Sequence, residues 1–404
     1  HPHPKGHSMQ NGIFQTGNPR WSAVFSLFMG VMALISAEFI PISLLTPIAR
    51  DLAVSEGMAG QTVTAVGVFA VLTSLLLAPL TGNIDRRRIL LAFSAMLVAS
   101  YMLIGMAPTY SIMLIGRAML GICVGGFWSL ASAVTLQLVP TKDVPRALSI
   151  VYAGVSVATI IALPVASWIG HLIGWRNVFF LGALMGAAGF VWQYRALPPL
   201  PARAGSGFRD MTALLRRTWV LAGIGGNILS FGGYHIFFTY LRPFLELDLA
   251  LGADTLSVIL LAFGVANILG TFIAGALLGN HFRPTMILIH LAFAAAALAL
   301  LLTQGHADVG VALAVFWGFA FGFTPVGWST WIARTLSDKA ELAGGLTVAA
   351  TQFAIGLAAA VGGFTYDNLG INGIFLAAAG ISVMAALLIA ASFSLFARDT
   401  GRRA

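Results

Sequence analysis

Long apolar stretches separated by short polar breaks recur along the whole chain. A helix of about 20 residues crosses the hydrocarbon core of a bilayer. Runs rich in Gly, Ala, Leu and Phe, rather than short alternating strands, favour helices over an outer-membrane barrel. The pattern predicts an all-α integral membrane protein with twelve spans, near residues 21–46, 58–80, 89–107, 111–138, 147–170, 176–195, 218–244, 255–279, 285–303, 309–332, 343–365 and 373–396.

Composition supports this interpretation. Of 404 residues, 58% are hydrophobic and only 9% are charged, and the mean hydropathy is +0.90. Soluble domains do not reach such values. The net charge of +8 does not indicate a nucleic-acid partner, because the charged residues gather between the spans. The partner expected from these features is the lipid bilayer.

The basic residues predict the orientation. If both termini lie in the cytoplasm, all but four of the 22 Lys and Arg residues fall on the cytoplasmic side. The exceptions are Arg50, Arg176 and Arg242 outside, and Arg117 within a span. Cytoplasmic loops carry an excess of Lys and Arg. We therefore expect a multi-pass protein of the bacterial inner membrane with both termini cytoplasmic.

The two halves of the chain repeat. Several motifs recur about half the chain apart: Pro47 with Pro243, Trp128 with Trp328, Lys142 with Lys339, and Gly174 with Gly370. A duplicated six-span unit in the same orientation implies two bundles about an axis normal to the membrane. The expected parts are an N-terminal tail (1–20), a first bundle (21–195), a cytoplasmic linker (196–217), a second bundle (218–397) and a C-terminal tail (398–404).

One acid and one base interrupt the apolar spans. Glu38 lies in the first span and Arg117 in the fourth, and helical rise places both about 10–12 Å below the outer edge. Ionisable groups inside a membrane persist where they pair or line a polar cavity. We expect the two side chains to pair, with Glu38 as the proton-coupling carboxyl and Arg117 setting its affinity for the proton.

A charged loop between the second and third spans is a candidate gate. An acid followed by arginines at helix ends can pair with the opposite bundle and hold one side of a pathway shut. The candidate gating residues are Asp85, Arg86, Arg87 and Arg88.

Four motifs occur at corresponding loops and spans: Asp85-Arg86, Gly116-Arg117 with Gly121, Pro164 in the fifth span, and the run Gly174-Trp175-Arg176-Asn177-Val178-Phe179. They resemble the signatures of the major facilitator superfamily, and the match is best for its twelve-span drug:H⁺ antiporter branch. The resemblance implies two pseudo-symmetric six-helix bundles and transport by alternating access. Segments 38–47, 125–128 and 325–332 are similar to the purine nucleoside exporters of that branch.

A nucleoside needs rings to stack on its base and hydrogen-bond partners for its base edge and ribose. We expect the second half to supply most of these contacts, because it lacks counterparts of Glu38 and Arg117. The candidate substrate-binding residues are the polar Asn227, His235, Asn267 and Gln352 and the aromatic Trp128, Phe238, Trp317, Phe321 and Trp328.

The sequence thus predicts a proton-coupled antiporter that exports purine ribonucleosides such as inosine or guanosine. Export of sugars or drugs on the same scaffold, or substrate sensing without transport, are the alternatives. No nucleophile–base pair, metal cluster or phosphate-binding loop indicates an enzyme, and no metal site or cofactor is expected since the proton gradient supplies the energy. We expect a monomer, because two bundles close their own pathway.

Overall fold

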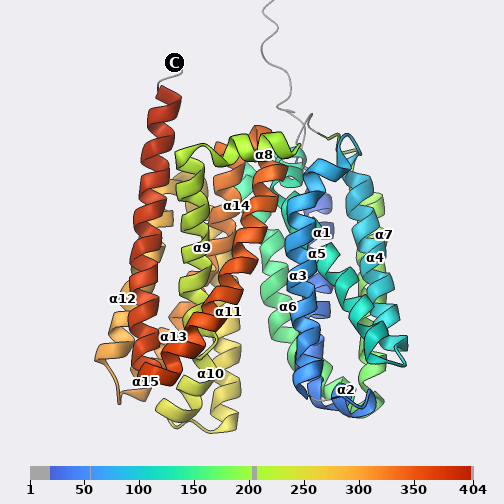
Figure 1. The fold of residues 1–404 in the computed structure, drawn as a ribbon, viewed down its shortest axis with the longest axis vertical. Helices are drawn as coiled ribbons and strands as arrows, with labels where there is room; N and C mark the ends of the chain where they lie inside the picture. Colours follow the sequence, from blue (N-terminus) through green and yellow to red (C-terminus); the bar gives the residue numbers. More distant parts are fainter. Residues whose placement is uncertain (1–18, 55, 203–206, 402–404) are drawn as a thin grey trace, which may run out of the picture.

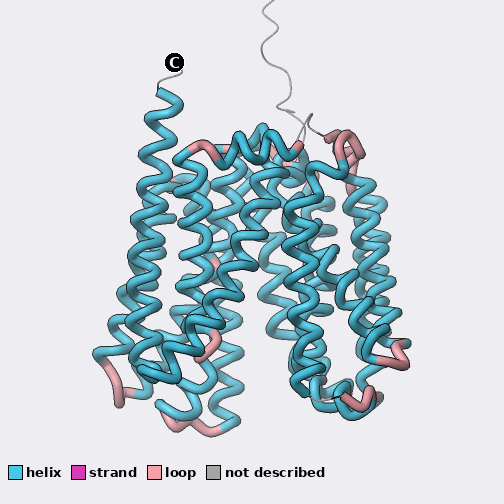
Figure 2. The backbone as a smooth tube through the Cα atoms, viewed as in Figure 1, coloured by secondary structure: helices cyan, strands magenta, loops and turns pink. Residues whose placement is uncertain are grey.

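The computed structural model describes residues 19–54, 56–202 and 207–401, and these residues are helical along nearly their whole length (Figure 2). The first half comprises α1 (Trp21–Ser43), α2 (Leu45–Asp51), α3 (Glu56–Thr81), α4 (Arg86–Met106), α5 (Tyr110–Leu138), η1 (Thr141–Asp143), α6 (Val144–Ile173) and α7 (Trp175–Ala196). The second half comprises α8 (Phe208–Leu215), α9 (Thr218–Phe238), α10 (Leu241–Pro243), η2 (Phe244–Asp248), α11 (Ala253–Asn280), α12 (Phe282–Leu302), α13 (Ala307–Phe321), α14 (Phe323–Thr335), η3 (Ser337–Lys339) and α15 (Ala340–Gly401).

Within the described residues, 10 helical stretches are long and apolar enough to cross a membrane. Two further long helices, α3 with 26 residues and α7 with 22, bring the number of long helical segments among the described residues to twelve. Helix α15 contributes two spans because Gly370, with φ 63°, breaks it, whereas α13 and α14 form a single span interrupted at Gly322. The predicted all-α, multi-pass membrane fold is confirmed.

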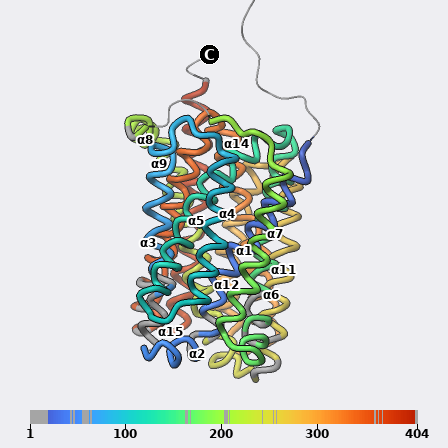
Figure 3. Tube along the Cα trace, turned by 90° about the vertical axis from the view of Figure 1, so that its right-hand side faces the viewer, coloured from blue at the N-terminus to red at the C-terminus, as the bar shows by residue number. Residues whose placement is uncertain are grey.

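The long helical segments form two groups (Figure 1). In the first bundle α1 packs on α6 and α7, and α5 packs on α3 and α4. In the second bundle α9 and α12 pack on α15, and α11 packs on α13. Figure 3 shows α8 and the C-terminal end of α15 at one end of the molecule and α2 at the other. We call these the α8 end and the α2 end.

The backbone carries the signature of the repeat. Ala53 and Ala250 have φ values of 52° and 51°, in the left-handed region that residues with a side chain rarely adopt. Gly174 and Gly370 likewise have φ values of 87° and 63°. Each pair lies about half the chain apart, at matching turns of the two bundles. The same turns are therefore built twice with the same unusual geometry.

The bundles touch each other near the α8 end. The beginning of α15 lies against α3 and α5, and α6 lies against α11 and α14. Glycine makes the first of these contacts possible, because a Cβ atom on Gly344 would lie 2.2 Å from the Ser129 carbonyl oxygen. A Cβ on Gly345 would lie 2.1 Å from the carbonyl oxygen of Ser74. Towards the α2 end the ribbons of the two bundles diverge (Figure 1).

Two expected segments differ in detail. The linker expected at 196–217 contains α8, whose Asp210 forms an ion pair of 2.9 Å with Lys339 of η3. Residues 398–401, expected in a C-terminal tail, continue α15 as helix. The helix persists because its last turns still pack on the bundle, with Phe396 against Trp219 at a ring distance of 4.8 Å. The expected N-terminal tail lies almost entirely outside the described residues.

Candidate functional site

Arg117 is fully buried where α5 crosses α1 and α3. Its guanidinium donates three hydrogen bonds to backbone carbonyls: Nη1 to Ala37 at 2.6 Å, Nε to Thr62 at 3.1 Å and Nη2 to Glu38 at 3.3 Å. The ion pairs found among the described residues do not include one between Arg117 and the Glu38 carboxylate. Arg117 does contact Glu38, but it binds the backbone carbonyl of Glu38 rather than the carboxylate.

Pro41 explains why Arg117 binds carbonyls. A proline has no N–H, so the carbonyl four residues earlier loses its helical partner. In α1 that carbonyl belongs to Ala37. Inside a membrane no water can replace the lost bond, and a neighbouring helix must supply a donor. Arg117 supplies it, and a guanidinium is suited to this task because it carries five N–H donors and stays charged.

Glu38 therefore keeps its carboxylate available. The Glu38 side chain is half-buried, and the ion pairs of the described residues do not include it. It lies in the half of α1 nearer the α2 end, where the bundles diverge. A carboxyl placed in this way can exchange a proton with the α2 end.

The charged loop before α4 connects the two bundles at the α8 end. Arg86 is buried and binds Glu341 of α15 with two hydrogen bonds, from Nε at 2.5 Å and from Nη2 at 2.8 Å. Such bidentate pairs are the strongest class of ionic hydrogen bond. Sequence reasoning missed Glu341, which lies just before the span predicted at 343–365, in the first turn of α15.

The other loop residues stay within the first bundle and its linker. Asp85 caps α4 by accepting from the Arg87 backbone N–H at 2.8 Å, and it also accepts from the N–H of Leu200 at 3.0 Å. Arg87 donates to the carbonyl of Tyr194 at 2.7 Å, and Arg88 is exposed. Of the four candidate gating residues, only Arg86 reaches the opposite bundle in the contacts described.

Three of the predicted substrate residues gather in one aromatic cluster of the second bundle. His235 and Phe238 of α9 and Phe321 of α13 surround Tyr234, whose ring is stacked on Phe321 at 3.5 Å and on Phe238 at 5.1 Å. His235 Nδ1 donates to the Phe231 carbonyl at 2.8 Å, which leaves Nε2 as an acceptor in the neutral ring. Phe238 is 38% exposed, so the cluster presents an open ring face.

Two further predicted residues lie at contacts between the bundles. Asn267 of α11 accepts a hydrogen bond from Ser156 of α6, and its Nδ2 donates to the Gly318 carbonyl at 3.0 Å. Trp128 stacks on Tyr152 at 4.7 Å, and the Tyr152 hydroxyl bonds to Ser329 of α14 at 2.7 Å.

Sequence reasoning missed Tyr152, Ser156 and Ser329 of these contacts. They could have been found as polar groups on spans that are otherwise apolar, since such groups need partners inside a membrane.

The remaining candidates lie inside the second bundle or at its edge. Asn227 is buried and accepts from Thr351 at 3.1 Å, and Trp317 is fully buried. Trp328 is 3% exposed and packs on Trp331 at 5.5 Å. Gln352 faces α3, with Nε2 3.8 Å from where a Cβ on Gly67 would lie. In this conformation Asn227, Trp317 and Trp328 support the bundle rather than line a pathway.

The arrangement is that of a membrane transporter. Two bundles meet at one end, polar groups lie at their contact, and an ionisable side chain sits in the half where they diverge. The described part of the chain holds no group of three His, Cys, Asp or Glu side chains that could bind a metal ion.

Comparisons with known proteins define the family. The model of the Major Facilitator Superfamily matches residues 23–336 and 223–403, and the chain belongs to this family of transporters rather than to an enzyme family. A Salmonella paratyphi C protein named purine ribonucleoside efflux pump NepI is 41% identical over 373 residues, 92% of this chain and 94% of the relative. The Escherichia coli K12 protein of the same name is 40% identical over 377 residues, 93% of this chain and 95% of the relative.

Solved structures share the fold. A human organic anion transporter superposes with a TM-score of 0.72 at 15% identity and covers 92% of this chain and 100% of its own. A proton:xylose symporter superposes with a TM-score of 0.73 at 15% identity, covering 91% and 94%. At this identity the likeness concerns the fold alone.

Proposed function

We propose that this protein exports purine ribonucleosides in exchange for protons by alternating access. It works as a monomer in the bacterial inner membrane, with both termini in the cytoplasm and without a cofactor. The observation that carries the proposal is the similarity over more than nine-tenths of the chain to relatives named purine ribonucleoside efflux pumps.

The contacts between the bundles support a state that is closed at the α8 end. The excess of Lys and Arg supports placing the α8 end in the cytoplasm. At that end the Arg86–Glu341 pair and the Gly344 and Gly345 backbone contacts join the bundles. Inward opening must break these contacts together with Tyr152–Ser329 and Ser156–Asn267.

Breaking the mid-depth contacts exposes hydrogen-bonding groups that a nucleoside satisfies. The side-chain oxygen of Asn267 and the hydroxyls of Tyr152 and Ser329 lose their partners when the bundles separate. Unpaired polar groups inside a membrane are costly. A ribose and a purine edge offer both donors and acceptors and replace the lost bonds, so substrate stabilises the inward-open state.

The aromatic cluster receives the base. Phe238 and Phe321 provide ring faces on either side of Tyr234, and offset stacking of aromatic rings contributes about 0.5–1.5 kcal/mol beyond the burial of area. His235 Nε2 accepts a hydrogen bond from the base edge. Glu38 binds a proton from outside after substrate release and gives it up on the inner side, which couples the proton gradient to export.

The test is flux into proteoliposomes. We expect labelled inosine to accumulate in inside-out vesicles under an imposed pH gradient, and a protonophore to abolish the accumulation. Excess unlabelled guanosine should compete, whereas arabinose or a lipophilic cation should not. Competition by either of the latter without competition by guanosine would assign the protein to sugar or drug export. Accumulation insensitive to the protonophore would contradict proton coupling.

A further inference from the structure

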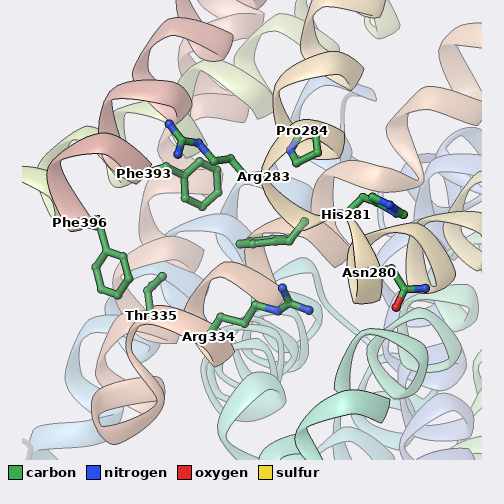
Figure 4. Close-up of a pocket in the computed structure, with 9 residues that line it drawn as sticks. Asn280, His281, Arg283, Pro284, Arg334, Thr335, Phe393 and Phe396 are labelled. Atoms are coloured by element: carbon green, nitrogen blue, oxygen red, sulfur yellow. The ribbon is translucent and has the colours of Figure 1, made fainter. Parts of the chain in front are cut away.

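A second polar feature lies away from the transport pathway, at the α8 end of the second bundle. There α11 ends, α12 begins and α14 ends around a cavity of about 430 Å³ (Figure 4). Arg283 of α12 and Arg334 of α14 both line it, and the rings of Phe393 and Phe396 lie along one side. The lining residues are Asn280, His281, Phe282, Arg283, Pro284, Arg334, Thr335, Phe393 and Phe396.

The cavity is cationic. Its lining holds two arginines and no Asp or Glu. Arg283 donates one hydrogen bond, from Nη2 to Ser394 at 3.2 Å, and Arg334 donates one, from Nη2 to the Gly279 carbonyl at 2.6 Å. A guanidinium has five N–H donors, so each retains several for a ligand. Among the ion pairs of the described residues, neither arginine has a carboxylate partner.

The repeat shows what this loop lacks. Gly279-Asn280 and Arg283 stand half a chain after Gly82-Asn83 and Arg86. In the first bundle Arg86 is buried and its charge is balanced by Glu341. In the second bundle the corresponding Arg283 is exposed, and among the described contacts its hydrogen bond goes to Ser394. Arg86 in the first bundle is therefore paired across the bundle contact, whereas the positive charge of Arg283 in the second bundle is available at the surface.

The position of the cavity matches the head-group layer. Helix α12 has 21 residues and is therefore about 31 Å long, close to the thickness of the hydrocarbon core. Its first residues, Phe282 and Arg283, then lie at the boundary between acyl chains and phosphates. The arginines also lie over rings, Arg334 over Phe282 at 5.0 Å and Arg283 over Phe393 at 5.9 Å. This combination suits a ligand with a phosphate and an apolar tail.

We propose that this cavity binds the phosphate of an anionic phospholipid. Arg283 and Arg334 hold the phosphate oxygens, the positive N-terminal end of α12 adds to the attraction, and Phe393 and Phe396 contact the glycerol and upper acyl region. Basic pockets between spans on the cytoplasmic side are suited to such head groups. The site stands apart from the transport pathway and does not depend on the substrate proposed above.

Lipid titration of the purified full chain, followed by native mass spectrometry in detergent, tests the proposal. We expect phosphatidylglycerol to bind more tightly than phosphatidylcholine. The double variant Arg283→Gln/Arg334→Gln should weaken phosphatidylglycerol binding about tenfold or more, since each basic residue near an anionic lipid adds roughly 1 kcal/mol. The single variant Arg283→Gln, which removes only the bond to Ser394, should show an intermediate loss and guards against misfolding of the double variant.

The matched control is Arg209→Gln/Arg398→Gln, which removes the same charge from exposed positions outside the cavity lining. It should leave phosphatidylglycerol binding within about twofold of the wild type, because these residues lie outside the cavity. Equal losses in both double variants, or equal binding of the two lipids by the wild type, would overturn the proposal. Displacement of phosphatidylglycerol by equimolar inorganic phosphate would assign the cavity to a soluble anion and overturn the lipid assignment.

Discussion

The two bundles place an N–H donor at the same helix crossing, but the donors differ. In the first bundle Arg117 of α5 donates to the Ala37 carbonyl of α1 at 2.6 Å. In the second bundle Trp317 of α13 donates to the Tyr234 carbonyl of α9 at 3.4 Å. The four residues stand about half a chain apart in pairs, so the duplicated fold keeps the crossing and changes the chemistry of the donor.

The difference separates two tasks. A charged donor next to Glu38 creates a polar place in the membrane where a carboxylate is tolerated. A neutral indole next to Tyr234 and His235 leaves an apolar surface of stacked rings. In the function that we propose, the first bundle thereby supplies the titratable group and the second supplies a surface for the aromatic base.

Substituting Glu38 in the first bundle should affect transport more than substituting His235 in the second. Glu38→Gln should abolish proton-driven inosine accumulation and spare inosine exchange, because the amide cannot carry a proton between the two sides. His235→Gln should keep proton coupling and raise the KM about tenfold, the expected cost of one well-placed hydrogen bond. Proteoliposome flux measures both. Retained accumulation in Glu38→Gln would show that another group carries the proton.

Removing the crossing donors should affect stability unequally. Arg117→Leu removes three hydrogen bonds and leaves the buried Ala37 carbonyl without a donor. It should lower the free energy of unfolding by roughly 3 kcal/mol or more, whereas Trp317→Phe should lower it by about 1 kcal/mol. Thermal unfolding in detergent gives the comparison, with Arg117→Lys as the variant that keeps the charge. Similar losses of unfolding free energy in Arg117→Leu and Trp317→Phe would mean that the two donors contribute equally to stability.

The loop arginines offer the same comparison at the α8 end. Arg86→Gln breaks the pair with Glu341 and should raise the population open at that end about tenfold, since loss of an ionic hydrogen bond corresponds to roughly 1.5–3 kcal/mol. Arg283→Gln should leave it unchanged. Spin labels at Asn83→Cys and Ala397→Cys, with Cys123→Ala as background, report the separation of the bundles. A shift with Arg283→Gln would remove the distinction between the loops.

The smallest effect is expected for the linker contact of α8. The hydrogen bond from Lys339 holds the pKa of the Asp210 carboxyl below its ordinary value of 3.8. A lowered carboxyl pKa stabilises the folded state above pH 3.8, and this contribution is lost only as the pH falls through the lowered value. Asp210→Asn should therefore lower the melting temperature by about a degree or less, equally at pH 6 and pH 8. A difference between these pH values would contradict the assignment.

Much of the fold could be predicted because the membrane simplifies it. The fourth span was expected at 111–138 and is observed as Tyr110–Leu138. The ends of α1 and α9 differ more, since the spans expected to 46 and 244 break at Ser43 and Phe238. At the α2 end, prolines and short helical turns end the helices before the apolar segments end, so hydropathy alone predicts spans that are too long.

The partners of the polar residues could not be predicted in the same way. Depth along a helix places Glu38 and Arg117 at one level but does not fix the direction of a side chain. Arg86 and Glu341 are 255 residues apart, and no local pattern joins them. The bond from Arg117 to Ala37 was predictable in principle, because Pro41 identifies the carbonyl that lacks its partner.

The glycines at the bundle contact set how the closed end is sealed. Since Gly344 and Gly345 bring main chain against main chain, closure at this contact does not require any side-chain rotamer to be selected. A single added methyl group would act as a wedge between α15 and its neighbours. The equilibrium between the states open at either end therefore depends on Gly344 and Gly345 as well as on the charged pair.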